Sequence, residues 1–65
     1  SEPFSWRALS ELARLHGFSV EDLTRRGGRL WVSGPPEDGF VGSKLTEWGF
    51  RWARQRNAWY RDEST

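Results

Sequence analysis

Two stretches of this chain repeat one pattern thirty-two residues apart. Residues 13–20 read ARLHGFSV and lead to LWV at 30–32, while residues 45–52 read LTEWGFRW and lead to AWY at 58–60. Each copy has an amphipathic segment, a Gly-Phe pair, an alternating run, an arginine-bearing loop and a second run centred on Trp. Because self-similarity constrains a whole fold, the repeat predicts two α-β-β units, each with arginines at the tip of its hairpin.

The first unit opens with a helix predicted over residues 6–16. Ser5 is a typical N-cap, and Phe4 and Leu9 have the spacing of a hydrophobic staple. Apolar residues then recur at helical spacing, and Gly17 is a typical residue at the C′ position.

The second unit predicts a helix over residues 39–48, with Asp38 as its cap and Gly49 at its end. Gly42 lies inside this segment and weakens a helix by about 1 kcal/mol relative to alanine. The Pro- and Gly-containing loop at 35–39 separates the two units.

Strands are predicted by alternating apolar and polar residues and by turn residues between the runs. The four predicted strands cover residues 18–22, 29–33, 50–53 and 57–61. Gly27 and Gly28 close the first hairpin, and Arg54-Gln55-Arg56 form the second turn. A competing interpretation takes Ser19 as an N-cap and residues 20–25 as a short helix.

Residue parity divides the strands, because successive side chains point to opposite faces. If register follows the repeat, the face beneath both helices holds Phe18, Val20, Leu30, Val32, Phe50, Trp52, Ala58 and Tyr60. The opposite face then holds Arg29, Trp31, Ser33, Arg51, Ala53, Asn57, Trp59 and Arg61. The side chains expected to be buried are Leu9, Leu12, Leu30, Val32, Leu45, Phe50, Trp52 and Tyr60.

These elements predict an α+β fold with two layers and the order α-β-β-α-β-β. Its four-stranded antiparallel sheet carries both helices on one face, with an internal α-β-β duplication. Residues 1–65 are one small domain, and the lack of Met with Ser1 at the start suggests a domain cut from a larger protein. The chain has no cysteine and one histidine, so we expect no disulfide, no metal or other cofactor, and a reducing cytoplasmic setting. No apolar run approaches the length of a membrane span, so we expect none.

Charge is unevenly distributed, although the net charge is only +1. Residues 25–34 carry +3 and residues 49–61 carry +4, so positive charge falls in the predicted hairpins. Nine of the ten cations are Arg, whose planar fork suits phosphates and aromatic stacking. Arginine richness can also reflect a GC-rich genome.

Residues 17–32 (GFSVEDLTRRGGRLWV) and the closing GFRW…AWY at 49–60 resemble small domains near the ends of large bacterial proteins, many helicase-like or restriction-related. The pattern is roughly G-[hydrophobic]-x-V-x-D-x-R-x-x-G-G-x-L-W-V, and the resemblance covers about residues 12–61. Thr24 departs from it, since the pattern has Arg there, so a pair with Asp22 is missing. The resemblance implies an accessory module of a nucleic-acid-handling protein.

No catalytic constellation is present, so we expect a protein that is not an enzyme. His16 lacks a local partner to activate, and the acids at 21–22 and 37–38 lie at turns where carboxylates serve as caps. Arginines in the hairpins can neutralise phosphates, and outward Trp rings can stack on unpaired bases. The candidate nucleic-acid-binding residues are Arg25, Arg26, Arg29, Trp31, Arg51, Arg54, Arg56, Trp59 and Arg61.

The sequence therefore predicts a monomeric, non-catalytic module that binds nucleic acid, with single-stranded or junction DNA favoured over RNA. The alternative is a protein–protein interaction module that docks a partner, or another domain of the parent protein, through the Trp-bearing sheet face. Trp31 and Trp59 can also belong to the core of so small a domain. Arginine stems lying over Trp rings would be a stable arrangement without function.

Overall fold

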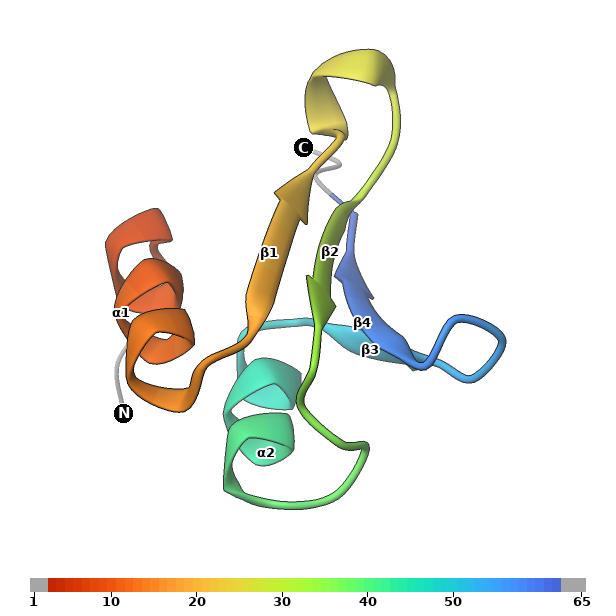
Figure 1. Ribbon diagram of the computed structural model, residues 1–65. Coiled ribbons are helices and arrows are strands. Elements are labelled where there is room, and N and C mark those ends of the chain that lie inside the picture. Colours follow the sequence, from red (N-terminus) through yellow and green to blue (C-terminus); the bar gives the residue numbers. More distant parts are fainter. Residues whose placement is uncertain (1–2, 63–65) are drawn as a thin grey trace.

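The computed structural model describes residues 3–62 of the chain. Its elements follow the order α-β-β-α-β-β, with a short 3₁₀ turn in the first hairpin (Figure 1). The elements are α1 (Trp6–His16), β1 (Ser19–Asp22), η1 (Thr24–Arg26), β2 (Leu30–Ser33), α2 (Phe40–Glu47), β3 (Arg51–Ala53) and β4 (Ala58–Arg61). Neither helix in this described part is long and apolar enough to cross a membrane.

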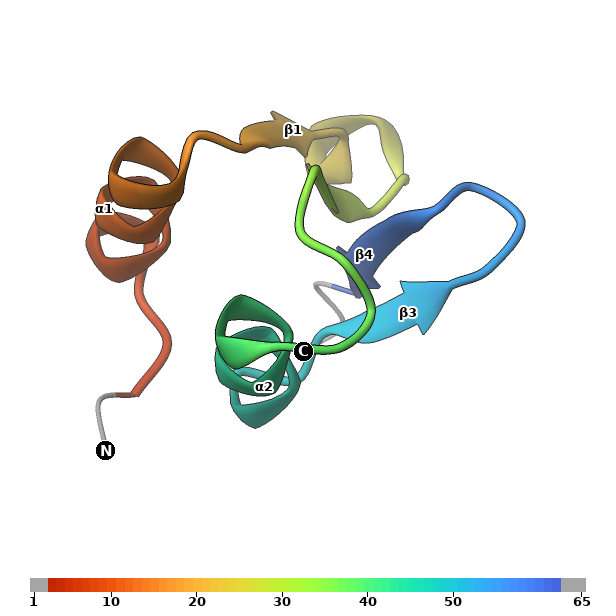
Figure 2. The same cartoon turned by 60° about the horizontal axis from the view of Figure 1, so that its bottom comes forward.

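The four strands form one antiparallel sheet in the order β1-β2-β4-β3. Both helices lie on the same side of the twisted sheet (Figure 2). The side chains buried between these layers come from both helices and from the two central strands, β2 and β4, together with Trp48 and Phe50 from the connection between α2 and β3. The predicted α+β fold is therefore confirmed, and neither α1 nor α2 lies on the other side of the sheet. We call that side the open face.

The two helices end in the same way. The amide of Phe18 donates to the carbonyl of Ala13 at 3.2 Å, and the amide of Phe50 donates to that of Leu45 at 2.9 Å. Each bond spans five residues across a glycine with positive φ, which is the Schellman arrangement. The repeated Gly-Phe pair thus corresponds to a repeated helix terminus.

The two helices begin differently. The Ser5 hydroxyl accepts from the amide of Ala8 at 3.0 Å, so the predicted cap of α1 is confirmed. Asp38 does not cap α2, because the cap position belongs to Gly39 and no side chain bonds there. Gly39 has φ 119°, a conformation that glycine adopts without the cost a side chain would bring.

The competing helix over residues 20–25 is wrong. Residues 19–22 pair with β2 along their whole length, and only residues 24–26 form a 3₁₀ turn. Asp22 sets this turn, since its carboxylate accepts from the amide of Thr24 at 2.9 Å and from the Thr24 hydroxyl at 2.6 Å. These bonds hold the pKa of Asp22 below its ordinary value, the hydroxyl bond contributing most.

The core differs from the predicted set mainly in its aromatic residues. Among the described residues, the buried hydrophobic ones are Ala8, Leu9, Leu30, Trp31, Val32, Leu45, Trp48, Phe50, Ala58 and Trp59. Leu12, Trp52 and Tyr60 are only half-buried, and Tyr60 does not face the helices. Trp48 and Trp59, which are not in the predicted set, belong to the buried cluster.

Strand register explains the exchange of Tyr60 for Trp59. Val20 pairs with Val32, whereas Trp52 pairs with Trp59, so the residue equivalent to Val32 in the second unit is Trp59. The first hairpin has seven residues between its strands and the second has four. This odd difference reverses residue parity in β4, because a slip of one residue turns every side chain to the other face. Trp31 and Trp59 therefore lie on opposite sides of the sheet, and their predicted equivalence is wrong.

Candidate functional site

The open face presents two aromatic rings from the central strands. Trp31 on β2 and Tyr60 on β4 are paired across the sheet, and their ring centroids are 5.6 Å apart at an interplanar angle of 47°. Their chain neighbours Leu30 and Trp59 point into the core, so alternation sends both rings away from the helices. Residue parity predicts this position for Trp31 but not for Tyr60.

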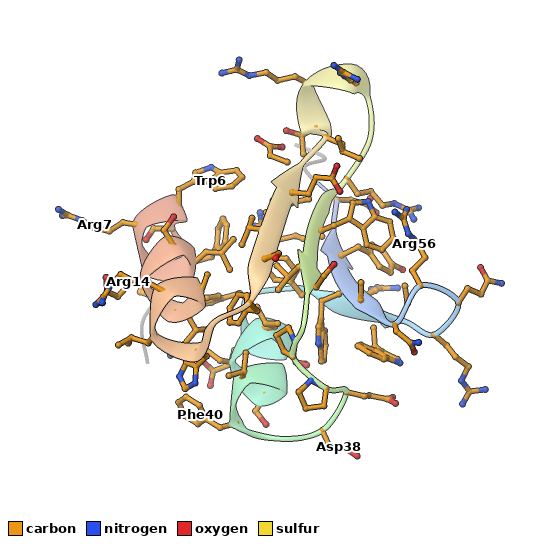
Figure 3. All side chains as sticks on the ribbon, in the orientation of Figure 1. Trp6, Arg7, Arg14, Asp38, Phe40 and Arg56 are labelled. Carbon is orange, nitrogen blue, oxygen red and sulfur yellow. The ribbon has the colours of Figure 1, made fainter. Side chains whose placement is uncertain are left out.

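Each ring carries an arginine. The guanidinium carbon of Arg56 lies 3.9 Å from the centroid of the Trp31 ring, and that of Arg29 lies 4.6 Å from the centroid of Tyr60. Arg56 reaches back toward the strands from the turn between β3 and β4 (Figure 3). Cation–π attraction and contact area stabilise both placements. We call these four residues, Arg29, Trp31, Arg56 and Tyr60, the open-face cluster.

The cations of this face differ in their acidic partners. Arg29 donates from Nε to the carboxylate of Asp62 at 2.8 Å, and both side chains remain about half exposed. Among residues 3–62, no acidic side chain forms an ion pair with Arg51, Arg54 or Arg56. Three positive charges therefore remain available to an anionic ligand.

A shallow hollow of about 530 Å³ lies over the open-face cluster. The β3–β4 turn forms its other wall through Arg54 and Gln55, and Ala53 lies beneath them. Arg51 borders a second hollow of about 300 Å³ beside Tyr60. The face is thus a concave surface with aromatic rings at its floor and arginines around them.

Trp59 is not part of this site. Its side chain is 3% exposed in the core, its Nε1 donates to the carbonyl of Pro35 at 3.3 Å, and its ring meets Trp52 edge-on at 5.4 Å. The expectation that Trp59 stands outward among the arginines is wrong, because the short second hairpin reverses the parity of β4.

Arg61 also lies on the helix side of the sheet. Its Nε donates to the carbonyl of Trp48 at 3.0 Å, and its guanidinium carbon lies 4.2 Å from the centroid of Phe4. These contacts hold the end of α2 against β4. Its expected place on the binding face is therefore wrong for the same reason of register.

Arg25 and Arg26 lie at the other end of the sheet. Because β2 is antiparallel to both β1 and β4, the turn that follows β1 and the turn that precedes β4 fall at opposite ends. Figure 1 shows the first turn at the top of the sheet and the second at the right. The two clusters do not meet at adjacent loop tips, and the expected continuous basic surface is not formed.

Sequence reasoning missed Tyr60 and the position of Arg56 against Trp31. The signal was the length of the second turn, since four residues between Ala53 and Ala58 force paired residues to have opposite parity. A comparison of the two hairpin lengths shows that parity changes in the second hairpin, whereas aligning Trp31 with Trp59 assumes that it does not.

The histidine and the acidic residues form no metal-binding site among residues 3–62. His16 is exposed at the end of α1, and its ring faces Phe40 with centroids 6.1 Å apart. In the part of the chain that is described, no group of three His, Asp or Glu side chains is placed to hold a metal ion. The carboxylate of Glu11 binds Arg14 one turn later, which lowers the pKa of Glu11.

Comparison with known proteins adds no relative. No family model matches this chain, and no curated protein or solved structure is significantly similar to it.

Proposed function

We propose that this protein is a non-catalytic nucleic-acid-binding module that uses the open sheet face. The observation that carries the proposal is the open-face cluster, in which two aromatic rings each lie beside an arginine. One of these arginines, Arg56, has no ion pair with an acidic residue in the range 3–62, and neither have Arg51 and Arg54 beside the cluster. Arginine binds phosphate through a planar fork and stacks on aromatic rings, so both parts of a nucleotide match this surface.

Phosphate binding supplies the larger part of the expected affinity. Arg51, Arg54 and Arg56 are exposed on or beside the face, and each phosphate they neutralise releases counterions. The proposed ligand is single-stranded or junction DNA rather than a regular duplex, since only unpaired bases offer a ring face to Trp31 or Tyr60.

The protein-docking alternative has less support on this face. The large apolar side chains that are exposed among the described residues are Trp6, Leu15, Val20 and Phe40. None of them lies on the open face: three belong to the helices, and Val20 shares the core side with Val32. A partner at the open face would meet guanidinium groups rather than a dry apolar surface.

In the same proposal the module belongs to a larger cytoplasmic protein that handles nucleic acid. The resemblance of its GGRLWV and AWY segments to bacterial accessory domains supports this part of the proposal. A weak isolated affinity is then sufficient, because tethering to other binding sites raises the effective concentration.

A chemical-shift titration with short single-stranded and duplex oligonucleotides tests the proposal. At low salt, amide resonances of β2, β4 and the β3–β4 turn should shift, and the affinity should fall steeply as salt rises. Arg54→Gln should lower the slope of log affinity against log salt by about 0.7 on a single strand.

The double variant Arg25→Gln/Arg26→Gln is the matched control, because it removes charge from the opposite end of the sheet. Its salt slope should stay close to that of the unchanged protein. A larger loss with this control than with Arg54→Gln would move the interface to the first hairpin. If neither oligonucleotide shifts any resonance at low salt, nucleic-acid binding is wrong and docking of a protein partner becomes the better hypothesis.

A further inference from the structure

We infer that the Trp31 ring is a stacking site for an unpaired base and that Arg56 occupies this site in the free protein. This inference rests on the proposed function and assigns its ligand class, since a base can reach the ring only from a single strand. Binding would then exchange one flat group, the guanidinium of Arg56, for another, the base.

Burial and geometry identify the occupied site. Trp31 is only 7% exposed although it lies on the face without helices. Arg56 lies directly over its ring at 3.9 Å, which is the distance of a stacked contact, and Tyr60 covers it from the neighbouring strand. A base cannot lie on this ring face while the guanidinium remains there.

The two arginines of the open-face cluster are held differently. Arg29 is fixed over Tyr60 by its 2.8 Å bond to Asp62, whereas Arg56 has no ion pair with any residue in the range 3–62. Arg56 also belongs to a four-residue turn and is exposed. The replaceable cation is therefore the one on Trp31, and Tyr60 stays covered.

The exchange favours a single strand. Stacking of a base on an aromatic ring contributes more than the contact of an exposed arginine with the same ring. The displaced Arg56 keeps its charge and stands beside the bound nucleotide, where it can pair with a phosphate. Bases of a duplex keep their faces covered by their neighbours, so a duplex gains only the phosphate contacts.

This arrangement gives Arg56 two opposing effects on affinity, whereas Arg54 has one. Arg54 lines the same hollow and has the same charge, but within residues 3–62 it makes no cation–π contact. Arg54→Ala should only remove a phosphate partner. Arg56→Ala should remove a phosphate partner and also uncover Trp31.

The experiment compares Arg56→Ala with Arg54→Ala by fluorescence anisotropy, using labelled oligothymidylate and a labelled hairpin duplex. On the duplex, the two variants should lose affinity equally at every salt concentration. On oligothymidylate at high salt, where phosphate contacts are screened, Arg56→Ala should bind several-fold more tightly than Arg54→Ala. Equal affinities on the single strand at all salt concentrations would overturn the exchange.

Trp31→Ala provides the second arm. It should reduce oligothymidylate affinity about tenfold, reduce duplex affinity little, and abolish the difference between the Arg56 and Arg54 variants. Should Trp31→Ala fail to fold, Trp31→Phe keeps a ring and identifies the Trp31 indole N–H resonance by its disappearance. That resonance should shift with oligothymidylate and not with the duplex, and an unmoved resonance would refute the site.

The proposed function and this inference fail differently. If Arg54→Ala and Arg56→Ala both lower the salt slope but behave alike on the single strand, phosphate binding stands and the stacking site is wrong. The arginine over Trp31 is then a packing contact. If neither oligonucleotide binds at low salt, both are wrong.

Discussion

Gly42→Ala should destabilise this protein, although helix propensity alone predicts the reverse. Gly42 lies inside α2, where alanine is favoured over glycine by about 1 kcal/mol. In the fold, however, a methyl group at this position would lie 2.7 Å from the carbonyl oxygen of Glu37 and 3.0 Å from a ring carbon of Trp59. Neither neighbour is a flexible side-chain end.

The magnitude follows from these contacts. The backbone of residues 35–37 crosses α2 here, and the carbonyl of Pro35 accepts the Trp59 indole bond. Making room for the methyl group must move this segment or the Trp59 ring, and overpacking a core costs about 1–3 kcal/mol. After the propensity gain is subtracted, we expect a net loss of about 1 kcal/mol. For a domain of this size that lowers Tm by about 4–8 °C.

Thermal unfolding followed by circular dichroism measures the effect, with Ser43→Ala as the matched control. Ser43 is the next residue of α2 and is exposed, so alanine there gains a few tenths of a kcal/mol of propensity without a clash. The control should melt at or slightly above the temperature of the unchanged protein. A Tm of Gly42→Ala that equals or exceeds that of Ser43→Ala would show that the close approach over α2 is wrong.

Two further predictions concern the core and the first hairpin. Leu45→Ala should cost about 2–5 kcal/mol in chemical denaturation because Leu45 is fully buried, whereas half-buried Leu12→Ala should cost clearly less; equal losses would contradict the observed core. The lowered pKa of Asp22 implies that its contribution to stability is present above its ordinary pKa of 3.8 and is lost as pH falls through the lower folded value. Thr24→Val removes the hydroxyl bond, so an NMR titration should find the Asp22 pKa raised toward 3.8, and an unchanged pKa would show that this bond is not its cause.

Local structure followed from the sequence because its causes are local. Ser5 caps α1 through a bond to the third residue beyond it, and Gly17 permits the positive φ that ends the helix. The alternating runs give strands, and the central apolar run at 30–32 places Leu30 and Val32 in the core as predicted. The α+β class follows from the order of these elements.

The sequence by itself determined only part of the candidate site. Parity in β2 gives the open-face position of Trp31 and Arg29 from sequence, since both halves of the first hairpin have the predicted register. The second hairpin does not follow the repeat, so Tyr60 was assigned to the core and Trp59 to the surface. One extra or missing residue in the turn decides which of Tyr60 and Trp59 faces the core. The intrinsic strand propensities of Tyr and Trp do not distinguish the two arrangements.

What only tertiary structure decided are the relations between distant segments. Arg56 meets Trp31 because the β3–β4 turn folds back over a strand twenty-five positions earlier in the chain. The two arginine clusters separate because β4 pairs with β2, which sends their turns to opposite ends of the sheet. Sequence periodicity specifies which face a residue prefers, whereas pairing order and turn length specify which residues share that face, because these depend on how the elements close around one core.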